Sequence, residues 1–131
     1  MTNEEKVQYW IELSDSDLEV AEAMLRGRYH LYVVFMCHQV VEKIFKGYYT
    51  KLTEDTPPFT HDLTVLATRG GFIDSLTAEQ MLFVERLGPL NIRTRYPDYK
   101  RELAKTLSHA VCVEIVGQTK TLQQWTKEKL S

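Results

Sequence analysis

The longest stretch with one consistent hydrophobic pattern is YVVFMCHQVVEKIFKGYY, residues 32–49. On a helical wheel at about 100° per residue, its apolar side chains form one wide arc and most of its polar side chains gather in a single stripe. One neighbour cannot cover so wide an arc, so we expect a central helix packed between several others. The polar stripe should be its exposed edge, and spacing favours a solvated face over one wall of a site. The stripe comprises His38, Gln39, Glu42, Lys43 and Lys46.

An amphipathic segment precedes this central helix. Thr2 and Glu5 have the spacing of a capping box, which predicts a helix start near the N-terminus. The apolar positions keep a near-helical period up to Leu25, with a polar gap at residues 14–17, so we expect one helix that tolerates the gap. Gly27 is a candidate C-cap. The short connection that follows makes the first two helices antiparallel neighbours.

The middle of the chain contains shorter segments separated by helix-breaking residues. Pro57 and Pro58 cannot continue a helix and predict a loop. Thr60 is the predicted N-cap of a short helix, which should end at Gly70–Gly71. A second capping box, Thr77 with Gln80, predicts the start of another helix.

Two further breaks are predicted after that helix, at Gly88–Pro89 and at Pro97. A last helix should run from about Asp98 or Lys100 to about Lys127. The side chains expected on its inner face are Leu103, Leu107, Ala110, Val111, Val113, Val116, Leu122 and Trp125.

No segment shows sustained strand alternation, and no hairpin signal occurs. The chain of 131 residues is long enough to bury a core without metals or disulfides. The sequence therefore predicts a single all-α domain over residues 1–131. Its architecture should be an up-and-down antiparallel four-helix bundle with one additional short helix.

Composition narrows the class of protein. Apolar residues make up 44% and charged residues 26%, which is typical of a globular domain, and the formal charge of −2 gives no support for nucleic-acid binding through overall charge. Cys37 and Cys112 lie in apolar helical patterns and are expected to be buried thiols. The polar N-terminus and the lack of a long apolar run predict no signal peptide, no membrane span and a cytoplasmic location.

A second group of candidate residues surrounds Pro97. Guanidinium groups beside aromatic rings suit the recognition of phosphates and bases. Arginines and tyrosines at a helix break also serve to fix helix ends and to bridge to acids such as Glu42, and spacing alone favours that structural role. The group comprises Arg93, Arg95, Tyr96, Asp98 and Tyr99.

No complete catalytic set is visible. The sequence lacks phosphate-binding loops, nucleophile elbows and metal-ligand spacings, so we predict no catalytic residue, no metal and no cofactor. His61 and Asp62 are adjacent, and adjacent helical residues do not face each other, so helix capping explains them better than a catalytic pair.

Four stretches together resemble the HEPN domain family, the nucleotide-binding domain shared by higher eukaryotes and prokaryotes. The central one is similar to the family's Gln-x-x-Glu-Lys-x-x-Lys pattern, which falls here on Gln39, Glu42, Lys43 and Lys46. The four stretches are Trp10 with DLEVAEAML (17–25), FMCHQVVEKIFKGYY (35–49), THDLTVL (60–66) and RYPDY (95–99).

This resemblance implies a helical bundle that pairs as a homodimer, often beside a minimal nucleotidyltransferase in a toxin–antitoxin pair. Family members that are RNases carry an Arg followed four to six residues later by His. Here Arg93 and Arg95 are followed by no histidine before His109, so the chain is similar to the branch that carries Arg-Tyr-Pro-Asp instead.

For that branch the resemblance implies nucleotide or RNA-phosphate binding or a partner role. The alternatives are a dimeric scaffold without a ligand, and a metal-independent RNase whose acid or base is His38, His61 or Glu42. For binding, we expect Arg93 and Arg95 to fold against the lysine-bearing edge of the central helix. The predicted ligand-binding residues are Arg93, Arg95, Tyr96, Asp98, Tyr99, Glu42, Lys43 and Lys46.

Overall fold

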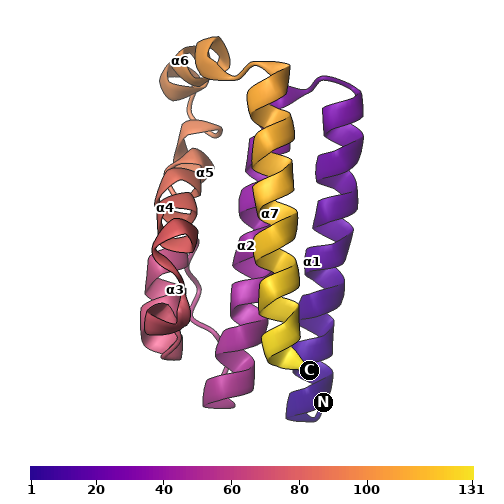
Figure 1. Ribbon diagram of the computed structural model, residues 1–131, viewed down its shortest axis with the longest axis vertical. Helices are drawn as coiled ribbons and strands as arrows, with labels where there is room; N and C mark the ends of the chain where they lie inside the picture. The colour runs from indigo at the N-terminus through magenta and orange to yellow at the C-terminus, as the bar shows by residue number, and fades with distance from the viewer.

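Three long helices lie side by side and form most of the molecule (Figure 1). The computed structural model describes residues 1–131 and contains helices and no strand, so the predicted all-α bundle is confirmed. The long helices are α1 (Asn3–Arg26), α2 (His30–Thr53) and α7 (His109–Leu130).

Short helices supply the remaining side of the bundle. They stand along α2 on the side away from α1, and α6 lies at the same end of the molecule as the α1–α2 turn, on the opposite side of α7 (Figure 1). The fourth layer of the predicted bundle is therefore assembled from pieces. The pieces are α3 (Leu63–Gly70), η1 (Ile73–Ser75), α4 (Ala78–Leu87), α5 (Leu90–Arg93) and α6 (Pro97–Thr106).

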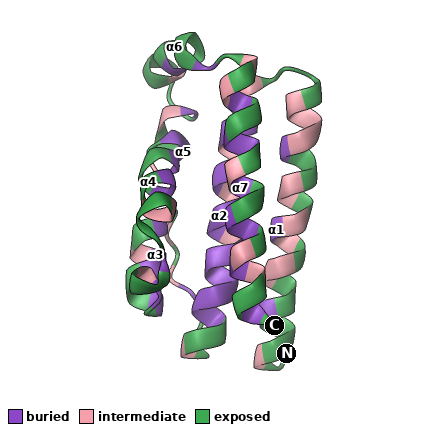
Figure 2. Cartoon of the chain, viewed as in Figure 1, coloured by how far each residue is buried: buried purple, intermediate pink, exposed green.

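Helix α2 lies at the centre, as its wide apolar arc predicts. Its buried residues follow one another almost without interruption from Val40 to Thr50, and Figure 2 shows buried positions along its length. The predicted buried cysteines are confirmed, since Cys37 and Cys112 both lie in the core as free thiols. Burial raises the pKa of Cys37 to about 12. No helix is both long and apolar enough to cross a bilayer.

Local capping signals predict most of the helix starts. Both capping boxes are present, that of Thr2 with Glu5 and that of Thr77 with Gln80. The prediction for Thr60 is wrong, because Asp62 caps α3: its carboxylate accepts hydrogen bonds from the backbone N–H groups of Thr64 and Val65 at 3.0 and 3.1 Å. The Thr60 hydroxyl accepts only from the N–H of Asp62.

The predicted breaks are confirmed, and one break was missed. Helix α3 ends at Gly70 and is capped by Gly71, whose φ of 83° suits glycine; α4 ends before Gly88, and Pro97 opens α6. The expected single last helix is wrong, because α6 ends at Thr106 and the hydroxyl of Ser108 caps a new helix.

This break changes the inner face of the last helix. Ala110 and Val113, which were expected to face inward, are exposed, whereas Ile115 and Thr119 are buried. The helix that begins after a new N-cap is rotated about its axis relative to the one before. The spacing of inward-facing residues in α6 therefore does not continue into α7.

The polar residues that interrupt the apolar pattern of α1 lie where α1, α2 and α7 meet. Ser14 is fully buried and donates a hydrogen bond to the carbonyl of Val40 in α2 at 2.8 Å. In turn, Nε2 of Gln123 in α7 donates to the Ser14 hydroxyl at 3.0 Å. A small hydroxyl at this position lets the three long helices approach closely while every polar group there is paired.

Replacing Ser14 by alanine should lower the free energy of unfolding by about 1 kcal/mol, because Gln123 loses one buried hydrogen-bond partner. Urea unfolding followed by circular dichroism measures this change. Ser16→Ala on the exposed side of α1 is the control and should change stability little. Equal effects of the two substitutions would contradict the role assigned to Ser14.

Candidate functional site

The polar stripe of α2 is buried, contrary to expectation. His38 is 0% exposed, Glu42 2% and Lys46 9%, while Gln39 and Lys43 are partly exposed. The interpretation as a solvated face is therefore wrong. Segments far along the chain cover this side of α2, and a single-helix pattern carries no information about them.

Glu42 is the centre of the buried stripe. Its Oε1 accepts a hydrogen bond from Nδ1 of His61 at 2.8 Å, and its Oε2 accepts one from Nζ of Lys46 at 3.0 Å. Burial by itself raises the pKa of this carboxyl, but the hydrogen bonds and charges of His61 and Lys46 outweigh it, so the pKa lies below its usual value. Glu42 is thus a paired carboxylate, and its partners are not the arginines proposed from the sequence.

His61 is a functional candidate because it is hydrogen-bonded to Glu42, a pairing that was not predicted from the sequence. Its side chain is 52% exposed, and the bond to Glu42 fixes the orientation of the ring. With Nδ1 engaged, Nε2 is left for solvent or a ligand. No signal in the sequence locates this pair, because segments far along the chain bury Glu42; once its burial is known, the carboxylate requires charged or hydrogen-bonding partners.

His38 lies one helical turn before Glu42 and has no hydrogen bond at either ring nitrogen. Its Nδ1 is 3.8 Å from Oε1 of Glu42, which is too far for a hydrogen bond. Burial lowers the pKa of His38 to about 4, an effect that the charge of Arg95 and the neighbouring His61 reinforce and that of Glu42 opposes. His38 is therefore a neutral imidazole at pH 7.

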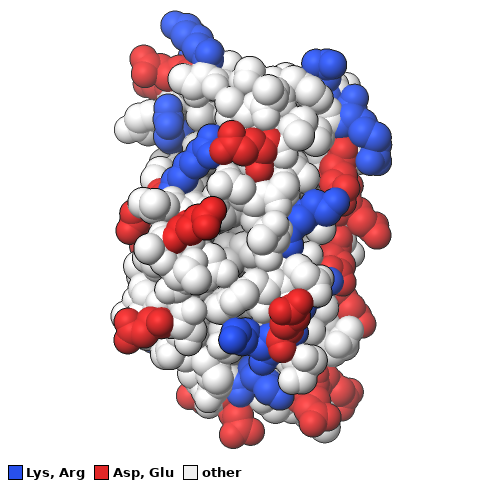
Figure 3. All heavy atoms as spheres, in the orientation of Figure 1, with Lys and Arg blue, Asp and Glu red and all other residues white.

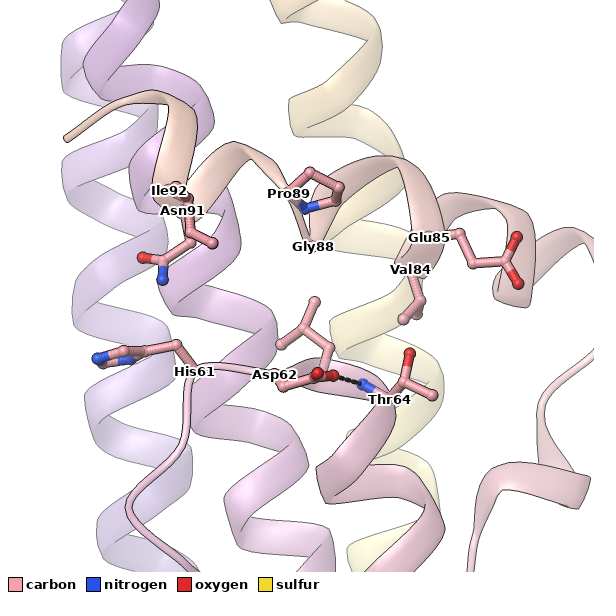
Figure 4. Close-up of a pocket in the computed structure, with 10 residues that line it drawn as sticks. His61, Asp62, Thr64, Val84, Glu85, Gly88, Pro89, Asn91 and Ile92 are labelled. Atoms are coloured by element: carbon pink, nitrogen blue, oxygen red, sulfur yellow. Dashed lines mark hydrogen bonds between the residues drawn. The ribbon is translucent and has the colours of Figure 1, made fainter. Parts of the chain in front are cut away.

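Beside His61 is a cavity of about 460 Å³ between the start of α3 and the bend from α4 to α5. Asn91 of α5 lines it, and in Figure 4 the side chain of Asn91 extends toward the side on which His61 lies. Asn91 is only 5% exposed, and its Oδ1 has no hydrogen-bond partner. Asp62 and Glu85 also line the cavity, although the carboxylate of Glu85 points away from His61 in this view.

The residues around Pro97 lie against the first turns of α2. The guanidinium of Arg95 lies over the ring of Phe35 at 5.5 Å, and Nζ of Lys100 lies over the ring of Tyr32 at 5.9 Å. Together with Thr94, these side chains border a second cavity of about 210 Å³. We call Arg95 and Lys100, with Tyr32 and Phe35 beneath them, the cation–aromatic surface.

Two tyrosines extend this surface toward solvent. Tyr96 and Tyr99 are 57% and 53% exposed, and their rings meet edge to face at 6.5 Å. Asp98 is exposed in the first turn of α6, and Arg93 is partly buried at the end of α5. Neither forms an ion pair with another side chain. Figure 3 shows Lys and Arg interspersed with acids at the end of the molecule that carries α6, and a larger share of acids along the edge formed by α1.

The predicted single notch of arginines and lysines is not formed as expected. Lys43 pairs with Asp17 of α1 at 2.8 Å, and Lys46 pairs with Glu42 while its Nζ lies 5.7 Å from the ring centre of Trp10. From Phe35, the contact of Arg95, to Lys43 is about 12 Å along the helix at 1.5 Å per residue. The two groups follow the same helix, but the lysines are occupied by acids and the arginine is not.

Three groups of candidate residues follow one another along α2. The cation–aromatic surface comes first, the buried His38 next, and the Glu42–His61 pair with its cavity last. No group of three or more His, Cys, Asp or Glu side chains is arranged to hold a metal ion. The arrangement therefore offers cations for an anion and an oriented imidazole beside a cavity.

Comparison with known proteins gives two matches. A family model described as "HEPN domain" matches residues 7–130. The crystal structure of the protein TT1696 from Thermus thermophilus has a similar fold, with a TM-score of 0.79 and 18% sequence identity over 95% of this chain and 98% of that one. No curated protein sequence matches the chain.

The buried His38 predicts a loss of stability in acid. Its pKa is near 4 in the folded chain and 6.5 in an unfolded one, so the unfolded state takes up a proton first as the pH falls. The free energy of unfolding should drop by about 2 kcal/mol between pH 7 and pH 5, with the contribution of His38 fully present above pH 6.5. Urea unfolding at several pH values measures it. The control is His38→Leu, which should remove this part of the dependence; parallel pH profiles for both proteins would show the assignment to be wrong.

Proposed function

The chain belongs to the HEPN domain family, and on this basis we propose that it binds the phosphate groups of a nucleotide or of RNA at the cation–aromatic surface. The observation that carries the proposal is the state of Arg95. Its guanidinium lies on the face of Phe35 and has no carboxylate partner. A cation held by an aromatic face keeps its N–H edge free, and that edge matches two phosphate oxygens.

The neighbours of Arg95 support the same role. Lys100 supplies a second cation that is held by a ring and not by an acid, and Arg93 supplies a third positive charge nearby in the chain. Tyr96 and Tyr99 offer exposed rings on which a base can stack. Asp98 acts through α6, whose N-terminus its charge stabilises.

The predicted residues of α2 take a different part in this proposal. Glu42 binds His61, Lys46 is paired with Glu42, and Lys43 is paired with Asp17 of α1. Their contribution to binding is therefore indirect, through the position of the elements that they join.

We expect Arg95→Gln to weaken binding of a short 5′-labelled RNA and of ATP about tenfold, since a charge-assisted bidentate contact is lost. Fluorescence anisotropy over a range of salt concentrations measures the affinity. The slope of log K against log salt concentration should become shallower by the contribution of about one phosphate contact. Arg69→Gln, at an exposed position on α3, removes the same charge elsewhere and is the control. Equal affinities of wild type and Arg95→Gln would refute the site.

The family also suggests a quaternary role, and we include it in the proposal. The chain acts as a homodimer beside a minimal nucleotidyltransferase, in a pair of the toxin–antitoxin type. Large exposed apolar side chains such as Leu82 (67%) and Ile92 (54%) on α4 and α5 are compatible with a partner surface.

Sedimentation should give a mass twice the 15.3 kDa of one chain. A minimal nucleotidyltransferase that is produced together with the chain should co-purify with it when only one of the two carries a tag. A dimer that binds neither RNA nor ATP would instead identify a scaffold without a ligand, and a monomer would remove the dimer from the proposal.

One observation favours a second candidate function, a metal-independent RNase. The bond of 2.8 Å from His61 to Glu42 orients an imidazole as a general base requires. It ranks second because the family's Arg-to-His RNase motif is absent. Incubation with mixed-sequence RNA in a chelating buffer tests it: cleavage by wild type that is lost in His61→Ala would promote it, and intact RNA would remove it.

A further inference from the structure

Phe59 is the most exposed large apolar side chain of the molecule, and it is held on a rigid turn. Its side chain is 105% exposed and takes no part in the core. The N–H of Thr60 donates to the carbonyl of Pro58 at 2.9 Å, which closes a tight turn around Phe59. The buried Pro57 fixes one end of this turn, and the hydrogen bond from His61 to α2 fixes the other. The chain therefore presents a large apolar side chain to solvent in one defined position.

A cavity with negative charge at its rim opens beside this turn. Phe59 is two residues from His61, which lines the cavity of about 460 Å³, so their Cα atoms lie within about 7 Å of each other. The lining includes the exposed residues Asp62 and Glu85 and no lysine or arginine. Neither carboxylate forms an ion pair, and Glu85 lies on the side of the cavity opposite His61 (Figure 4). Asp62 uses Oδ1 to cap α3, which leaves Oδ2 for a partner.

Apolar groups that a partner can reach accompany these charges. Ile92 is 54% exposed, Pro89 is exposed as well, and both line the cavity. Lysine and arginine side chains lay an aliphatic stem on apolar surface and keep the cationic end at its edge. The carboxylates attract such an end and repel the phosphates of nucleic acids and anionic lipids. The chemistry of this surface therefore matches a basic segment that also carries apolar side chains.

We propose that the turn at Phe59 and the cavity beside it form a docking surface for a basic amphipathic segment of another protein. Phe59 packs against the apolar side chains of that segment. One lysine or arginine of the segment lays its stem on Pro89 and Ile92 and directs its charge to Glu85. The cavity shares no lining residue with the one at Arg95, so this inference goes beyond the phosphate site and does not depend on it.

Fluorescence anisotropy with two labelled peptides tests the surface on the full chain. One peptide carries leucine and lysine at the spacing of an amphipathic helix, and the other has glutamate in place of every lysine. Wild type should bind the lysine peptide about tenfold or more tightly than the glutamate peptide, because the rim of the cavity is negative.

Phe59→Ser should weaken binding of the lysine peptide about tenfold, since an apolar anchor is lost. Phe59 lies outside the core, so this variant keeps the fold and its loss of affinity reports on the surface alone. Tyr29→Ser is the control, because Tyr29 is also exposed (59%) but lies at the α1–α2 turn. It should leave the affinity unchanged.

Glu85→Lys reverses one charge at the rim and should weaken the lysine peptide about tenfold. Asp74→Lys makes the same reversal at an exposed position in η1, beyond the other end of α3, and is the matched control. It should change the affinity by no more than about twofold. Arg95→Gln should leave peptide binding unchanged while it weakens RNA, which separates this surface from the phosphate site.

Failure of the lysine peptide to bind, or equal binding of the two peptides, would overturn the proposal. Equal effects of Glu85→Lys and Asp74→Lys would do the same. If the lysine peptide does not bind and Phe59→Ser converts a dimer into a monomer in sedimentation, a second copy of the chain is the occupant instead. The phosphate site stands in each of these cases as long as RNA binding depends on Arg95.

Discussion

The buried carboxylate of Glu42 is the constraint on which the arrangement of this side of the molecule depends. An ionised group on a covered face of a helix is tolerated only when charged hydrogen-bond donors reach it. Lys46 comes from the next turn of α2, and His61 comes from the loop before α3. The bond to His61 therefore holds the chain that follows Pro57–Pro58 against the central helix and sets where α3 begins. The cavity beside His61 exists because α3 and α5 meet α2 around this anchored point.

Features that depend on neighbours in sequence could be predicted. Capping boxes, a glycine at φ 83° and a proline at the first helical position each act within one turn, so the residues that specify them are visible in the chain. The break at Leu107–Ser108 contains no glycine or proline. Serine also occurs inside helices, so Ser108 alone did not indicate an N-cap. Asp62 replaced Thr60 as a cap for a similar reason, since two good caps stand two residues apart and only the path of the loop decides between them.

The cationic residues of the candidate site could be predicted from the sequence, whereas the side chains that pair with them could not. From the sequence alone, Lys43 and Arg95 are equally good candidates for binding a ligand. In the fold, an acid on a neighbouring helix pairs with Lys43, whereas an aromatic ring holds Arg95 and leaves its edge open. The acid of one pair lies 26 residues away in the chain and the bond from His61 to Glu42 spans 19, so both pairings depend on tertiary contacts. The cluster around Pro97 was found because its residues are contiguous.

The short helix α5 lies between the cavity beside His61 and the cation–aromatic surface, and its length explains how both form. The bend at Gly88–Pro89 and the start of α6 at Pro97 leave room for little more than one turn between them. One turn is enough to place Asn91 on the wall of the cavity and Arg95 over the ring of Phe35, while the Thr94 hydroxyl donates to the carbonyl of Leu90. A longer helix at this place would also cover the space between the bend and α3 in which the cavity lies. The same breaks that deny the bundle a fourth continuous helix therefore give this side of α2 its cavity and its uncovered arginine.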